Sequence, residues 1–246
     1  MRPSGKLKHD ALVEALVDIR FETPQAIPEE LVIGRLADRE PWPSWNMRRL
    51  PTSEIPFAVR QVEQGLKYQA TVELREPENR AAVKIGANIL SIHLLAPYPG
   101  WSEFKSRIEE ALTDIFKRLP GVRIVRLGLR YVNAFEAERH GISSIEDLNL
   151  QVLLAGEDLG SSINLNFRKD RSNDHAIMTK VASVDFVQGK LSKSATVIAD
   201  IDVFTPREYS EANQSEVMRW IEQAHDFEKD SFFALLTDSQ IKELSE

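Results

Sequence analysis

The fold is decided by residues 11–22, which read ALVEALVDIRFE. Its odd positions are all apolar, and its even positions carry every charge of the stretch: Glu14, Asp18, Arg20 and Glu22. Because successive side chains of a strand point to opposite faces, this stretch predicts a strand with one buried face and one open, mixed-charge face.

Other stretches repeat this alternation, and helical signals separate them. We expect further strands at about 67–75, 81–86, 89–95, 122–135, 150–155, 162–168, 176–187 and 195–204. Helical spacing, proline and capping signatures predict helices at about 28–39, 102–119 and 213–233, with short ones after Ser143 and Thr237. Alternating strands are typical of antiparallel sheets with one solvated face. The sequence therefore predicts an α+β fold, a curved antiparallel sheet with two long helices on one face.

The order of the predicted elements repeats along the chain. After a flexible leader at 1–10, residues 11–120 and 121–246 each read strand, helix, several strands and long helix. We expect these halves to form a single compact unit. A pseudo-twofold duplication like that of TATA-binding proteins fits this order, and one α+β domain without internal symmetry is the alternative.

Composition narrows the classes of function. The 246 residues contain no cysteine, which excludes disulfides, thiol nucleophiles and cysteine-ligated zinc and suits a reducing cytoplasm. The net charge is −7, residues 1–120 are neutral overall, and neither half has the basic excess that duplex DNA binding favours. No apolar run approaches the roughly 18 residues of a membrane span. No phosphate loop, dinucleotide fingerprint or His-Glu-x-x-His motif is present, so no cofactor is predicted.

Three short motifs resemble a known family. They are the strand Gly128-Leu129-Arg130-Tyr131-Val132-Asn133, the opening strand from Leu12 to Phe21, and the segment from Trp220 through His225 to Leu236-Thr237. Together they resemble a sporadically distributed bacterial protein family of unknown function whose members have about this length. The resemblance implies a bacterial origin and carries over no activity. It also suggests an accessory or mobile system, which the gene neighbourhood would test.

The polar sheet face is the first candidate for a binding site. Its best indication is a set of basic side chains that share the polar register of their strands: Arg20, His93, Arg126, Arg130 and Arg168. Arginine forks bind carboxylate and phosphate in a bidentate manner, so the ligand would be anionic. A merely solvated sheet face, stabilised by cross-strand ion pairs, is the structural alternative.

Asp200 and Asp202 lie two apart on one predicted strand and therefore share a face. This spacing can hold a divalent cation through oxygen ligands. Ion pairing with Arg20 or Arg130 is the favoured alternative.

Other polar and aromatic residues receive structural interpretations. None of the five histidines has metal-ligand spacing with another, although His93 could serve as a general base. Tyr131 and Asn133 are expected on the apolar side of their strand, with Asn133 hydrogen-bonding strand to helix. Residues 40–57 contain four prolines with Trp42 and Trp45, which predicts an irregular loop with aromatic anchors.

The leading hypothesis is a non-catalytic, cytoplasmic bacterial binding or interaction protein. It would hold an unknown protein or an anionic small molecule on the polar sheet face, or a partner on the loop at 40–57. The alternative is a metal-dependent enzyme acting on a phosphate-containing small molecule through Asp200, Asp202, Arg20 and Arg130. A homodimer formed through an exposed strand edge or the C-terminal helix is a third hypothesis.

Overall fold

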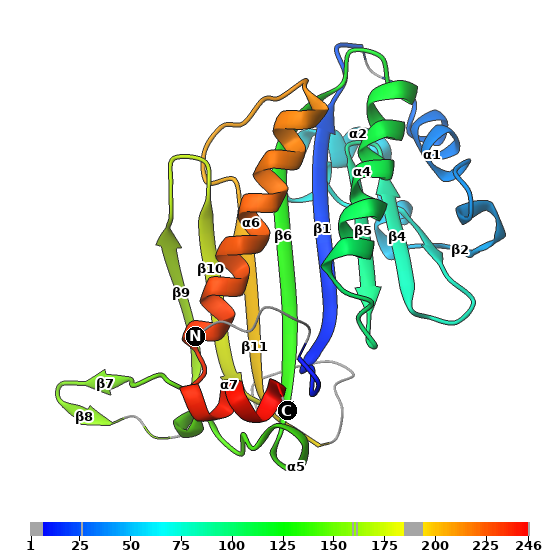
Figure 1. The fold of residues 1–246 in the computed structure, drawn as a ribbon. Coiled ribbons are helices and arrows are strands. Elements are labelled where there is room, and N and C mark those ends of the chain that lie inside the picture. Colours follow the sequence, from blue (N-terminus) through cyan, green and yellow to red (C-terminus); the bar gives the residue numbers. More distant parts are fainter. Residues whose placement is uncertain (1–6, 26, 159, 161, 185–193, 246) are drawn as a thin grey trace. The chain divides into compact units, whose positions relative to one another are not determined.

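Runs of strands are separated by helices in the computed structural model, which describes residues 7–25, 27–158, 160, 162–184 and 194–245. Nine strands form one antiparallel sheet in the order β2-β3-β4-β5-β1-β6-β11-β10-β9 (Figure 1), and β7 with β8 forms a separate hairpin. This arrangement confirms the α+β class and the antiparallel sheet.

The chain divides into two compact units. The first unit comprises Met1–Ala15, Arg130–Pro206 and Gln223–Glu246, and the second comprises Leu16–Leu129 and Arg207–Glu222. The boundaries between these units fall after residues 15, 129, 206 and 222. Two long strands and the last long helix cross between the units, which is why each unit is built from separated segments.

The second unit contains most of the first half of the chain. Its elements are β1 (Leu12–Glu22, from Leu16), α1 (Glu29–Ala37), η1 (Trp42–Ser44), β2 (Asn46–Arg49), η2 (Pro51–Glu54), α2 (Phe57–Val62), α3 (Gln64–Lys67), β3 (Val72–Arg75), β4 (Ala81–Gly86), β5 (Ile89–Leu95), α4 (Trp101–Arg118) and the start of β6 (Arg123–Glu136). It also holds the first part of α6 (Gln214–Ala234).

Helix α4 supplies much of the core of the second unit. Five of its apolar side chains recur at helical spacing and are buried, namely Phe104, Ile108, Ala111, Leu112 and Ile115. Gly121, with φ of +72°, lies just beyond the helix, and a Cβ there would stand 2.7 Å from the Pro24 ring. The turn therefore requires glycine for both conformation and space.

A buried ion pair fixes α1 against α2 in the second unit. The Arg60 guanidinium bonds both carboxylate oxygens of Glu29, and the hydroxyl of Thr71 and the amide of Ala87 donate to the same carboxylate. Burial alone would raise the pKa of Glu29, but these donors outweigh it and hold the pKa below its ordinary value. The pair therefore organises a segment that has little apolar periodicity of its own.

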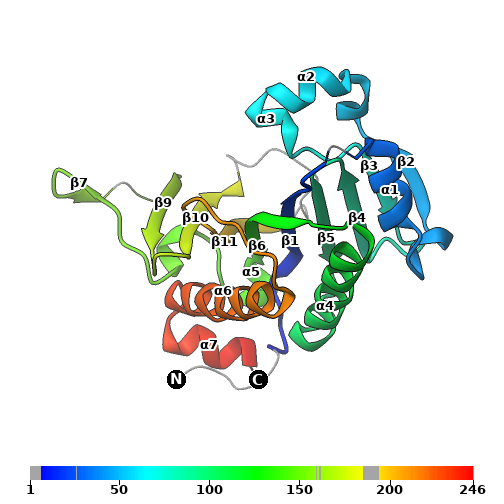
Figure 2. The same cartoon turned by 90° about the horizontal axis from the view of Figure 1, so that it is seen from above.

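The first unit contains the rest of the chain. Its elements are the start of β1, the end of β6, α5 (Ala137–His140), η3 (Ile145–Asp147), β7 (Leu153–Leu154), β8 (Glu157–Asp158), β9 (Asn164–Asp170), β10 (Ala176–Ser183), β11 (Ala195–Phe204), the end of α6 and α7 (Asp238–Ser245). The second part of α6 packs on the strands of this unit through Ala224, Glu228 and Phe232, which are buried. Figure 2 shows α6 running along one side of β6 and β11.

Several boundaries differ from those expected. Residues 40–57 contain the short strand β2, paired with β3, and the strand expected at 67–75 begins only at Val72 because α3 precedes it. The capping box forms at Ser144 and Asp147, one residue later than expected. The strand expected at 150–155 is the two-residue β7, and residues 185–187 of the strand expected at 176–187 lie outside the described residues.

The two halves of the chain share one strand order. In the first half, β1 lies beside β5, the last strand of the meander β3-β4-β5. In the second half, β6 lies beside β11, the last strand of β9-β10-β11. Each first strand is thus paired with the strand that directly precedes a long helix, α4 or α6.

Candidate functional site

The polar sheet face of the second unit is neutralised by its own side chains. Glu73, Lys84 and Ser91 lie opposite one another on β3, β4 and β5, and the Ser91 hydroxyl donates to Asp18 on β1. Glu73 is 1% exposed and accepts from Arg48 at 2.9 Å and from Arg75 at 2.8 Å. Burial opposes its charge, but the two arginines outweigh burial and lower the pKa of Glu73 to about 2.

Three of the sequence-predicted basic residues belong to this unit. The Arg20 guanidinium lies 5.2 Å from the centre of the Tyr68 ring, an arrangement typical of a cation–π contact. His93 is buried and stands opposite Ala82 of β4, so it does not present an open surface. Arg126 lies on β6 and is partly buried.

The remaining predicted residues belong to the first unit, where Arg130 and Asp200 form a bidentate ion pair. The guanidinium donates through Nε at 2.7 Å and Nη2 at 2.6 Å to the two carboxylate oxygens. The hydrogen bonds with Asp200 raise the pKa of Arg130 further above its ordinary value, in spite of burial. The ion pair that the sequence favoured over a metal at Asp200 is therefore present.

Asp202 and Arg168 take no part in those two hydrogen bonds, although the charge of Asp202 also raises the pKa of Arg130. Asp202 stands opposite Met178 of β10, which in turn stands opposite Arg168 of β9. Arg168 pairs with Asp170 at 2.9 Å and lies 5.6 Å from the ring centre of Phe204. Over the described ranges, no three histidine or carboxylate side chains gather as metal ligands.

The residues predicted to share one surface come from both units. Arg20, His93 and Arg126 lie in the second unit, whereas Arg130, Arg168, Asp200 and Asp202 lie in the first. The arginine contacts described above are with carboxylates or aromatic rings of the same unit. Pairing of this kind corresponds to the alternative given in the sequence analysis, a solvated sheet face stabilised by ion pairs instead of an anion-binding site.

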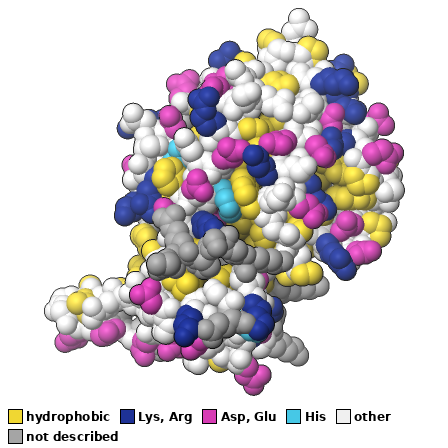
Figure 3. All heavy atoms as spheres, viewed as in Figure 1, with side chains coloured by type: hydrophobic (Ala, Val, Ile, Leu, Met, Phe, Trp, Pro, Cys, Tyr) yellow, Lys and Arg dark blue, Asp and Glu magenta, His cyan; other side chains and the backbone are white. Residues whose placement is uncertain are grey.

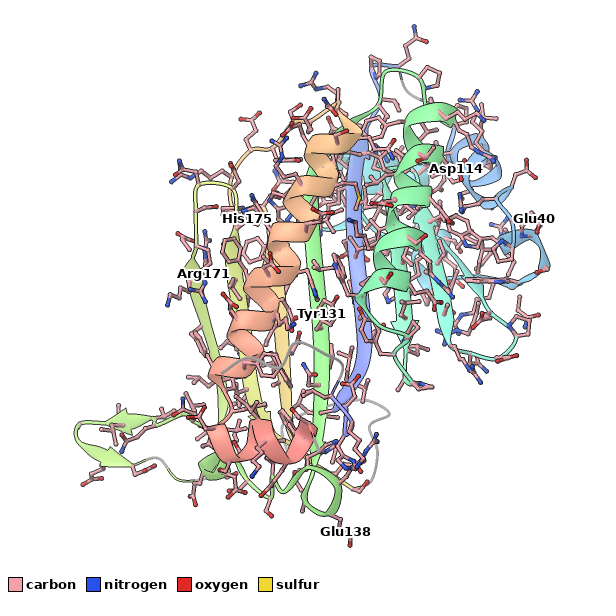
Figure 4. The ribbon with its side chains drawn as sticks, viewed as in Figure 1. Glu40, Asp114, Tyr131, Glu138, Arg171 and His175 are labelled. Carbon is pink, nitrogen blue, oxygen red and sulfur yellow. The ribbon has the colours of Figure 1, made fainter. Side chains whose placement is uncertain are left out.

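Buried titratable groups lie beneath the second part of α6 in the first unit. The hydroxyl of Tyr131, the residue labelled in Figure 4, is 3.4 Å from Nδ1 of His225. Burial, followed by the charge of Lys229, lowers the pKa of His225 to about 4. Glu228 is 5% exposed, and burial and then Asp10 raise its pKa to about 8. Asn133 is buried as expected, but its amide approaches the Ala199 carbonyl of β11 at 3.5 Å rather than a helix.

A cavity of about 290 Å³ lies in the second unit between α4 and the loop that follows α1. We call it the tryptophan cavity. Val83 and Ile92 form its floor on β4 and β5, and Trp42 and Trp45 line it from the loop. Both tryptophans are themselves largely buried, at 6% and 9% exposure, so they form a fixed wall.

Helix α4 supplies the opposite wall of the tryptophan cavity. Ser106 and three charged residues of this helix line it, namely Glu103, Arg107 and Glu110. Figure 4 labels Asp114, one turn beyond the lining residue Glu110 on α4, and Glu40, which precedes the lining residue Pro41. Apolar and aromatic surface with a few charged groups is the usual composition of a small-molecule site.

Both arginines that line the tryptophan cavity form ion pairs with neighbouring carboxylates. Arg39 contacts Glu110 and donates to Asp114 at 2.6 Å, and its guanidinium lies 5.7 Å from the ring centre of Trp42. Arg107 donates to Glu103 at 2.6 Å. Burial opposes the charge of Asp114, but Arg39 and Arg118 outweigh it and lower the pKa of that carboxyl.

A larger hollow in the second unit has a different character. It encloses about 610 Å³ near the turn after β1 and has apolar and proline side chains on most of its wall, with Arg35 as its charged residue. The sequence pointed to the tryptophan cavity through the aromatic anchors at 40–57, but it gave no signal for the α4 wall.

Comparisons with known proteins leave the function open. No family model matches this chain, and no curated protein matches it either. No helix in the described part of the chain is long and apolar enough to cross a membrane. Basic and acidic side chains are interspersed over the face drawn in Figure 3, which gives no large patch of one sign there.

Proposed function

We propose that this chain is a non-catalytic binding protein and that the tryptophan cavity is its ligand site. The observation that carries the proposal is a cavity with two buried indole side chains on one wall and charged residues of α4 on the other. Its volume is near the lower end of the roughly 300–1,000 Å³ typical of ligand pockets. The ligand is therefore a small molecule or a single side chain.

This proposal moves the binding site from the polar sheet face to the loop at 40–57, the second surface that the sequence singled out. On the polar sheet face, Glu73 and Arg130 are each held by partners of their own unit. A ligand there would have to displace those ion pairs, whereas the tryptophan cavity offers unfilled volume.

The metal-dependent enzyme receives less support. Both carboxylate oxygens of Asp200 accept hydrogen bonds from Arg130, so a cation at that carboxylate would have to compete with a fixed positive charge. The charges of Asp202 and Glu14 also act on Arg130, so these carboxylates already balance a fixed positive charge of the protein.

A pair of variants tests the cavity as the binding site. Ser106 is exposed and lines the cavity, so Ser106→Trp would fill it without disturbing the buried stripe of α4. Ser102 is exposed one turn earlier on the same helix and does not line the cavity, so Ser102→Trp is the matched control. A thermal-shift screen of amines, carboxylates, nucleotides and sugars against the unsubstituted protein would supply the ligands.

We expect at least one class of compound to raise the melting temperature, Ser106→Trp to abolish the shift, and Ser102→Trp to retain it. A screen without hits, or hits that survive Ser106→Trp unchanged, would contradict the proposal.

A further inference from the structure

One carboxylate oxygen at the tryptophan cavity is buried without a partner. Glu76 follows β3, and its backbone is fixed by hydrogen bonds to Ala81 at 3.0 Å and from Asn79 at 2.9 Å. Glu76 is partly buried and lines the cavity, and within the described part of the chain its Oε2 atom is withdrawn from solvent and has no hydrogen-bond partner. A buried, unsatisfied carboxylate oxygen is costly and calls for a donor.

The other charges of the cavity do not supply that donor. Arg39 is committed to Glu110 and Asp114, and Arg107 is committed to Glu103. The lining residues include three glutamates and two arginines, so the described lining carries a surplus of negative charge. A ligand that brings a positive charge would balance it.

The tryptophans favour the same kind of ligand. Indole rings attract cations through their negative faces, and the protein already uses this contact between Arg39 and Trp42. A group that enters the cavity from solvent meets Trp42 and Trp45 together with Glu76. A cation–π surface beside an unsatisfied carboxylate is the chemistry that recognises ammonium groups.

We propose that the tryptophan cavity binds a small organic cation with an N–H donor, a primary ammonium group on a compact apolar body, and that Glu76 holds the ammonium. This inference rests on the proposed function and names the ligand class for the same cavity. The ammonium belongs either to a free amine or to the side chain of a lysine, and the two sources share this chemistry.

Calorimetric titration with matched probes tests the charge preference. We would use 2-phenylethylamine as the cation, 2-phenylethanol as its neutral counterpart and 3-phenylpropionate as the anion, with Nα-acetyl-lysine methylamide for the lysine source. We expect the amine to bind at least about tenfold more tightly than the alcohol, and the anion more weakly than both. Tighter binding of the lysine derivative would identify a lysine side chain of a protein partner as the source of the ammonium. Tighter binding of phenylethylamine would identify a free amine as the source.

Variants of Glu76 test the residue itself. Glu76→Gln should lower the affinity for the amine to that for the alcohol while changing the affinity for the alcohol by less than about twofold. Glu76→Asp keeps the charge and should retain part of the preference. Glu78→Gln is the matched control, because Glu78 lies in the same turn with its side chain 68% exposed.

Several results would overturn the inference. They are equal affinity for amine and alcohol, an unchanged preference in Glu76→Gln, an equal loss in Glu78→Gln, or crystals grown with the amine that show only a water at Oε2. If neutral or anionic compounds bind instead and Ser106→Trp abolishes that binding, the proposed ligand class is wrong, but the tryptophan cavity is still the binding site. If Ser106→Trp leaves amine binding unchanged, the cavity itself is wrong.

Discussion

Glu73 in the second unit and Glu228 in the first unit are both almost completely buried, and the two have opposite protonation behaviour. Glu73 in the second unit is 1% exposed and lies between Arg48 and Arg75, which lower its pKa to about 2. Glu228 in the first unit is 5% exposed, and burial and the charge of Asp10 raise its pKa to about 8. Glu73 is therefore charged at neutral pH, whereas Glu228 is largely protonated.

The difference shows that the charged neighbours of a buried carboxyl, rather than its degree of burial, decide whether it is ionised. Burial raises the pKa of both carboxyls, but Glu73 receives two charge-assisted hydrogen bonds from guanidinium groups. Near Glu228, the neighbouring acid outweighs the single lysine, Lys229. The following substitutions are designed to remove this difference or to measure it.

Glu228→Gln should have the largest effect, and the effect should depend on pH. The folded-state pKa of about 8 lies above the ordinary value of 4.5, so Glu228 stabilises the fold most fully below pH 4.5. That contribution is lost as the pH rises towards and through 8. Glutamine cannot ionise, so the variant keeps its stability where the unsubstituted protein loses it. Between pH 4 and pH 9, the unfolding free energy of the variant should therefore rise by on the order of 4 kcal/mol relative to that of the unsubstituted protein. This value follows from about 1.4 kcal/mol per pKa unit.

Urea unfolding at several pH values would measure this gain. Glu222→Gln, on the same helix with its side chain 47% exposed, is the control and should show no comparable trend. Parallel stability curves for Glu228→Gln and the unsubstituted protein would show that Glu228 is ionised in the folded protein.

Glu73→Gln should destabilise the protein by about 2 kcal/mol at pH 7, because it removes the acceptor charge from two arginine hydrogen bonds. The folded-state pKa lies below the ordinary value, so this stability is present above pH 4.5 and is lost as the pH falls towards 2. The difference between variant and unsubstituted protein should therefore shrink at pH 3. Chemical unfolding at pH 7 and pH 3 measures it, and an effect no larger than that of Glu78→Gln would refute it.

Asp200→Asn should have a smaller effect than Glu73→Gln, about 1 kcal/mol. The Arg130 side chain is 44% exposed, so solvent screens the pair more than it screens Glu73. Asp170→Asn removes the exposed partner of Arg168 and should change stability by less than about 0.5 kcal/mol. Unfolding in low and in high salt would compare them, and equal losses in the two variants would contradict the ranking.

Alternation along the chain predicted most of the sheet. The strand expected at 195–204 coincides with β11 (Ala195–Phe204). One face of this strand is buried, and the apolar residues at alternate positions indicate that face in the sequence. The short strand β2 was missed, since its residues Asn46–Arg49 are all exposed and its pairing with β3 leaves no pattern in the sequence. The pseudo-twofold duplication, the bacterial origin and the homodimer stay predictions.

The candidate site was predicted only in part. Trp42 and Trp45 were recognised as anchors because large aromatic residues in a proline-rich loop need a surface to cover. Glu76 gave no signal, because its role depends on which helix packs above the hairpin. Glu228 could have been found from spacing alone, since it occupies a place in the buried series Val217, Ile221, Ala224, Glu228 and Phe232.

The two strands at the ends of the sheet order, β2 and β9, have a consequence for behaviour in concentrated solution. An outermost strand is a template on which another chain can build, and charged side chains discourage such growth. Here β2 carries Arg48 and Arg49, and β9 carries Arg168, Lys169 and Asp170. These charges protect the protein from fibrous aggregation, and exchanging them for threonine or valine would remove that protection.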